Sequence, residues 1–132
     1  MSSTYDQVKG YILELGLRIY EDVPGEELLI VDDTERGIRK LILDCEDGIL
    51  VLEQLILRLE PGTPPQTYKR LLQMNRSLVH GAFVLDESGE RLLFRDTLAL
   101  GNLDFNELEA TLNALSLGLA ENGAELLSFA GK

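Results

Sequence analysis

Pairs of adjacent carboxylates are the most frequent feature of this sequence with potential chemistry. Two carboxylates held close together can share a proton or bind a cation. The adjacent pairs are Glu26/Glu27, Asp32/Asp33 and Glu46/Asp47. Each pair falls at an expected strand end or turn, where carboxylates are hydrated and Asp caps backbone N–H groups. Residues 44–48 also lack the ligand spacing of a calcium loop. We therefore predict solvated turn residues here and no metal site.

His80 and Cys45 are the only histidine and the only cysteine in the sequence. His80 has no Ser, Cys or Asp at the spacing of a known nucleophile arrangement, and two such residues are too few for a structural zinc site. Cys45 is in phase with Leu41 and Leu43, which predicts a buried, unreactive thiol. No phosphate-binding loop, dinucleotide fingerprint or nucleophile elbow is present. We predict no catalytic residue, no cofactor and no enzyme; an enzyme that uses the acidic turns is the alternative.

Length and charge narrow the class of protein further. The chain has 132 residues, of which 45% are hydrophobic, so we expect a single domain spanning residues 1–132 with one core. Twelve Lys and Arg residues against 23 Asp and Glu residues give a net charge of −11, which disfavours binding to nucleic acid or to anionic lipid. No apolar stretch reaches the roughly 20 residues that span a bilayer, and the first residues do not resemble a signal peptide. We expect a cytoplasmic protein without membrane insertion.

Hydrophobic periodicity and turn residues predict the elements that must position any site. Helical spacing of apolar residues over 4–15 ends at Gly16. Four strand-like runs follow, separated by Gly-containing turns, at 18–20, 27–31, 39–45 and 49–59. A second helix is expected from Thr63, a hairpin over 81–97, and a third helix from Asp104 to about Gly123, with an apolar tail after it.

This order predicts an α+β domain. The strands are joined by turns too short for parallel crossovers, so we expect an antiparallel β-sheet with three helices in the order α-β(meander)-α-β-β-α. Asn75 falls on the inner stripe of the second helix, and it is expected to hydrogen-bond to backbone where the chain enters the hairpin.

The middle strands carry apolar residues on both faces, whereas a strand with one solvated face should alternate. Residues 28–31, 49–52 and 55–57 show this pattern. One explanation is that helices cover part of the second face and that a β-bulge near Glu53 and Gln54 switches the rest. The other is that a second copy or another chain covers it, because monomers rarely leave several hundred Å² of contiguous apolar surface exposed.

The sequence resembles the type III secretion chaperone-like superfamily, which includes the CesT-type Tir chaperones and the YbjN-type regulators. The resemblance rests on LLQMN at 71–75, GAFVLDESG at 81–89, residues 98–104, and the pair Glu107 and Leu108. It implies a compact α+β fold and, as in the secretion chaperones, a homodimer. It also implies a partner whose non-globular segment docks apolar side chains in surface grooves and pairs with sheet edges.

From the apolar strands, the acidic exterior and this resemblance we predict a non-enzymatic, chaperone-like protein that binds an extended segment of a partner protein. The residues expected to contact that partner or a second copy are Leu28, Ile30, Leu50, Leu52 and Ile56. The alternative is a YbjN-type regulatory or sensory domain that docks on a folded partner. Charge-mediated docking should weaken sharply with ionic strength, whereas apolar docking should change little.

Overall fold

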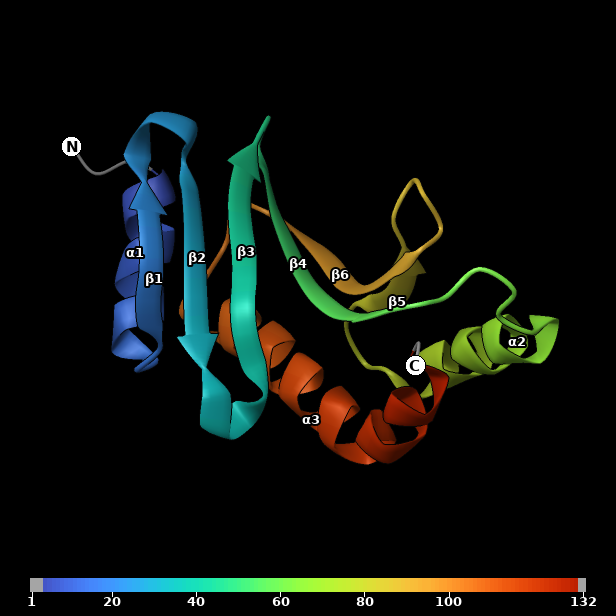
Figure 1. Ribbon diagram of the computed structural model, residues 1–132. Coiled ribbons are helices and arrows are strands. Elements are labelled where there is room, and N and C mark those ends of the chain that lie inside the picture. Colours follow the sequence, from blue (N-terminus) through green and yellow to red (C-terminus); the bar gives the residue numbers. More distant parts are fainter. Residues whose placement is uncertain (1–3, 131–132) are drawn as a thin grey trace.

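The computed structural model describes residues 4–130, which form a six-stranded antiparallel sheet with helices packed on one of its faces (Figure 1). The strand order is β1-β2-β3-β4-β6-β5. The elements are α1 (Thr4–Glu14), β1 (Arg18–Val23), β2 (Leu28–Asp33), β3 (Ile38–Glu46), β4 (Ile49–Arg58), α2 (Pro65–Met74), β5 (Ala82–Leu85), β6 (Arg91–Ala99) and α3 (Phe105–Phe129). This confirms the predicted fold class and the predicted order of helices and strands.

Short turns join the first four strands, as their Gly-containing sequences predict. Single 3-10 turns, η1 (Pro24–Glu26) and η2 (Thr34–Arg36), connect β1 to β2 and β2 to β3. Asp47 and Gly48 both have positive φ, at 48° and 80°, which matches the right-handed twist of the β3–β4 hairpin. The β1–β2 and β3–β4 turns lie at the same end of the sheet, where the Cys45 N–H donates to the Glu27 carbonyl at 3.0 Å.

A β-bulge in β4 explains part of the doubly apolar pattern. The register with β6 shifts between Leu55 and Leu57, so that Ile56 is the extra residue. Before the bulge the side chains at 50, 52 and 54 are buried, and after it Leu59 is buried instead. The predicted switch of faces is therefore confirmed, but it falls at Ile56 rather than at Glu53 and Gln54.

Asn75 fixes the end of α2 against the following hairpin, as the sequence predicts. Its side-chain carbonyl accepts a hydrogen bond from the Phe83 N–H at 2.7 Å, and its amide donates to the Phe83 carbonyl at 3.2 Å. The Asn75 side chain thus pairs the Phe83 N–H and C=O groups that point away from the sheet at its β5 edge.

Helix α3 begins as predicted but ends later. The Asp104 carboxylate accepts from the Glu107 N–H at 2.8 Å. The helix then continues through Gly123 to Phe129, where an end at Gly123 was expected. Glycine costs a helix interior only about 1 kcal/mol. Continuing the helix buries Leu126, which is 2% exposed, and this burial outweighs that cost.

The core lies between the sheet and the layer formed by α1 and α3, which Figure 1 shows behind the strands. The largest side chains that are fully buried there include Ile12 of α1, Leu41 of β3, Phe94 of β6 and Leu112 of α3. Gln54 is the one buried amide among residues 4–130; it accepts from the Arg39 N–H and donates to the Gly37 carbonyl, which holds the start of β3. Helix α1 is tied to the edge strand β1 because Tyr5 and Lys9 both donate to the Asp22 carboxylate.

Candidate protein-binding site

The sheet face opposite α1 and α3 is covered by no other described element, and we call it the open face. Strand alternation places on it the apolar side chains of Val23, Leu28, Ile30, Ile42, Ile49, Val51, Leu55, Val84 and Leu93. Three of them are well exposed: Ile42 at 37%, Ile49 at 44% and Leu55 at 51%. Charged side chains lie among them, because Asp44 pairs with both Leu28 and Val51 and Glu53 pairs with Ile42. The open face is therefore a mixed apolar and acidic surface, and its solvent-exposed apolar residues make it a candidate interaction site.

The five residues predicted to contact a partner separate into two groups. Leu28 and Ile30 lie on the open face and are half-buried among their neighbours. Leu50 and Leu52 point the other way into the core, with 0% and 1% exposure, and a partner on the folded domain does not reach them. Ile56, the bulged residue, is half-buried and packs against the edge of the core.

Sequence reasoning missed Ile42, Ile49 and Leu55, the most exposed apolar residues of the open face. Their direction depends on which side of the sheet the helices take, and alternation alone defines two faces without saying which is covered. The register shift at Ile56 puts Leu55 and Leu57 on different faces although they are two residues apart, and that shift is seen in the pairing of β4 with β6.

Acidic residues surround the open face at the end where the β1–β2 and β3–β4 turns meet. Residues 21–35 and 41–57, which include all of β2 and most of β3 and β4, contain no Lys or Arg. Asp44 and Glu46 lie on the open face of β3, and Asp47 follows in the turn. Among residues 4–130 these three carboxylates form no salt bridge with a Lys or Arg. Charge repulsion from Asp44, a hydrogen bond with it, and further repulsion from Asp47 raise the pKa of Glu46.

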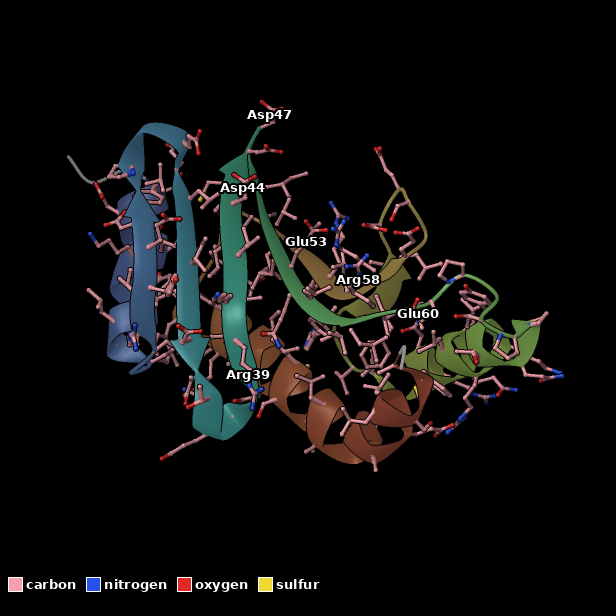
Figure 2. The ribbon with its side chains drawn as sticks, viewed as in Figure 1. Arg39, Asp44, Asp47, Glu53, Arg58 and Glu60 are labelled. Atoms are coloured by element: carbon pink, nitrogen blue, oxygen red, sulfur yellow. The ribbon has the colours of Figure 1, made fainter. Side chains whose placement is uncertain are left out.

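Figure 2 shows how charge is distributed along the two central strands. Asp44 and Asp47 lie at one end of β3, whereas Arg39 lies at its other end. Glu53 of β4 forms a salt bridge with Arg95 of β6 at 3.2 Å, so its charge is balanced within the open face. The unbalanced negative charge is therefore concentrated at one end.

A second apolar surface lies at the opposite edge of the sheet, where a groove of about 400 Å³ separates α2 from β5 and β6. Its lining includes Tyr68, Leu72, Phe83 and Leu85 and contains no charged side chain. Leu72 is 72% exposed and Leu85 is 42% exposed, so apolar side chains from both α2 and β5 face solvent at this groove. We call this surface the α2–β5 groove.

The side chains with potential chemistry do not assemble into a site. Cys45 is buried, and burial together with the nearby Glu27 and Asp44 carboxylates raises the pKa of its thiol to about 11. A thiol of this kind stays protonated and unreactive near neutral pH. His80 is exposed beside α3, far from Cys45 in the sequence. Within the described part of the chain, no three metal-ligating side chains come together.

The fold and the surface together define the class of protein. It is a small α+β domain with apolar side chains exposed on the open face and in the α2–β5 groove. The family model CesT_Tir_1 matches the whole chain, residues 1–132, and the protein belongs to that family. Comparison with curated proteins gives no match.

Solved structures share this fold at low sequence identity. YbjN from E. coli, described as a putative transcription regulator, superimposes with a TM-score of 0.69 and 14% identity over 92% of both chains. A chain of the ExoU-SpcU heterodimer from the type III secretion system of Pseudomonas aeruginosa gives 0.65 and 21% identity over 86% of this chain and 93% of that chain. A chain of the HopA1-SchA chaperone–effector complex gives 0.62 and 15% identity over 89% and 91%. The family match and these structures confirm the resemblance to the type III secretion chaperone-like superfamily.

Helix length and hydropathy bear on membrane insertion. Over residues 4–130, none of the helices combines the length and the apolar character needed to cross a bilayer.

Proposed function

We propose that this protein is a non-enzymatic, cytoplasmic, chaperone-like binding protein that holds a non-globular, extended segment of a partner protein. The observation that carries the proposal is the open face, where apolar side chains such as Leu28, Ile30 and Ile42 lie with no described element over them. Family membership and the chaperone–effector complexes among the structures that share the fold support it. The acidic exterior keeps the protein soluble despite this exposed apolar surface.

Binding would use two properties of the sheet. Side chains of the partner segment contact Leu28, Ile30 and Ile42 on the open face, which removes apolar area from water. Strand β1 lies at the edge of the sheet, and its outer backbone groups can pair with an extended stretch of the same partner. The partner would thereby be held without folding into a domain of its own.

The α2–β5 groove is the surface that we propose for a homodimer. It is uncharged and apolar, so two copies can meet there without like-charge repulsion. Its position at the β5 edge leaves the open face and the β1 edge free for a partner.

Replacing Leu72 with Lys should therefore convert the protein to a monomer. Leu72 is 72% exposed, so the substitution should leave the fold intact, while a charge in an apolar interface is costly. Light scattering after size exclusion should give twice the chain mass for the wild type and the chain mass for Leu72→Lys. Leu13→Lys, at a residue of α1 that is 58% exposed, should stay dimeric. A wild type that is monomeric at all accessible concentrations would contradict the dimer.

The alternative function is a YbjN-type regulatory or sensory domain that docks on a folded partner. The YbjN structure that shares the fold favours this alternative, and the acidic end of the open face could provide the contact. Such an interface would depend strongly on salt, because its charges are exposed to solvent.

Capture of partners from a lysate of the protein's own cells tests the proposal when it is done with matched variants. We expect the wild type and Leu13→Lys to retain one dominant partner at moderate salt and Ile42→Lys to lose it. Ile42 is partly exposed in the middle of the open face, so this variant should fold. Limited proteolysis of the complex should leave one protected, non-globular segment of the partner. A partner that Ile42→Lys still retains, or a folded partner without a protected segment, would rule out the proposed function.

A further inference from the structure

From the charge and shape of the open face we infer that the partner segment seated on it is a cationic amphipathic helix. This inference rests on the proposed function and adds that the non-globular partner segment is helical where it lies on the face, while its extended stretch pairs with the β1 edge. The helix would place apolar side chains on Leu28, Ile30, Ile42 and Val51. Its basic side chains would lie toward Glu46 and Asp47 at the acidic end, and one would reach Asp44, which lies between Leu28 and Val51.

The charge of the open face favours a basic partner over a second copy, because Asp44, Glu46 and Asp47 form no salt bridge within the described residues. An isologous contact with its two-fold axis along the strands would bring the acidic ends of two chains together, including Asp44 and Glu46 from each. Residues 21–35 and 41–57 supply no Lys or Arg that could balance them. Like charges that face each other in an interface oppose binding. A cationic partner, by contrast, would relieve the repulsion among these carboxylates.

Backbone hydrogen bonding favours a helix over an extended strand on the face. The open face offers side chains only, because the backbone groups of β2, β3 and β4 are already paired within the sheet. An extended segment lying across it would bury N–H and C=O groups without partners, whereas a helix pairs its own. An extended stretch is suited to the β1 edge, and a helical stretch is suited to the face.

The size of the surface matches one helix. Strands β3 and β4 have nine and ten residues, and at about 3.3 Å per residue they are about 30 Å long. A helix of about 20 residues has the same length. Three neighbouring strands span about 10 Å between the outer two, close to the diameter of a helix. A helix along β2–β4 would thus cover the central apolar side chains.

Three synthetic peptides of 18 residues test the inference. The first has Leu on one helical face and Lys elsewhere, the second replaces every Lys with Glu, and the third contains the Leu and Lys residues in an order with no helical apolar face. We expect the Leu/Lys helix to bind, as measured by fluorescence anisotropy, and to gain helical circular dichroism. The Leu/Glu helix and the reordered peptide should bind at least about tenfold more weakly, because each lacks one of the two complementary features.

Protein variants locate the binding and separate it from non-specific attraction to an acidic protein. Ile42→Lys should weaken binding of the Leu/Lys helix at least about tenfold, while Leu13→Lys, with the same charge change on α1, should have little effect. The double variant Glu46→Gln/Asp47→Asn should weaken binding and lower its salt dependence. The control double variant Glu14→Gln/Glu121→Gln removes the same charge from exposed helix positions. It should change neither the binding nor its salt dependence.

Equal binding of the Leu/Glu helix or of the reordered peptide would overturn the inference, as would full binding to Ile42→Lys. The result is independent of the capture experiment. If Ile42→Lys loses the natural partner but no Leu/Lys helix binds the wild type, the open face binds a partner of another class. If Ile42→Lys keeps the natural partner, the proposed function itself fails.

Discussion

The Leu50→Asp variant should not fold. Leu50 is 0% exposed and lies between the sheet and the helical layer. Loss of a buried leucine side chain costs about 2–5 kcal/mol, and burial of an unpaired carboxylate costs several kcal/mol more. Because small domains have a total stability of about 5–15 kcal/mol, the two losses together remove most or all of it. We expect circular dichroism to show no cooperative thermal transition for this variant.

Leu55→Asp is the matched control, since it changes the same residue type in the same strand. Leu55 is 51% exposed on the open face, so its carboxylate stays hydrated and the domain should melt cooperatively near the wild-type temperature. The sequence pattern predicts Leu50 as a residue that contacts a partner, but its complete burial makes it a core residue instead. A folded Leu50→Asp would show that β4 presents the opposite face to the core.

Gly81→Ala should be the most destabilising change of a single methyl group. Gly81 has φ of +74°, and a Cβ added there would lie 2.3 Å from the Cζ atom of Phe94. Phe94 is 1% exposed and stacks edge-to-face on Phe83, so it cannot move aside without disturbing the core. Overpacking and left-handed backbone together should lower the free energy of unfolding by about 3 kcal/mol. Chemical denaturation measures this directly.

Two further variants identify the cause of that loss. Gly10→Ala, in the middle of α1 with no atom near the added Cβ, should raise the stability by about 0.5–1 kcal/mol through helix propensity. In a Phe94→Leu background, Gly81→Ala should cost less than in the wild type, because the smaller side chain relieves the contact but not the backbone strain. An identical cost in both backgrounds would show that the ring contact contributes nothing.

The candidate site shows where sequence reasoning works and where it stops. The apolar runs of β2 and β4 correctly indicated that these strands have two apolar faces. The first explanation, a bulge, accounts for the residues after Ile56. Leu28 and Ile30 lie on the open face, and its cover by a second copy or another chain stays a prediction. Choosing among Leu50, Leu52 and Leu55 required knowledge of which side the helices occupy, and periodicity does not contain that information.

Local chemistry in the sequence determined the elements of this protein. These elements depend on residues that are close together in the chain, so the sequence alone predicts them. Examples are the Asp47–Gly48 turn, the cap of α3 at Asp104 and the hydrogen bonds from Asn75 to Phe83. Tertiary structure alone decided the rest. It placed α1 and α3 on the same face, carried α3 through Gly123 because Leu126 gains burial, and brought the acids of two turns together at one end of the open face. The physical reason is that these outcomes depend on contacts between distant segments, whose energies a local pattern does not encode.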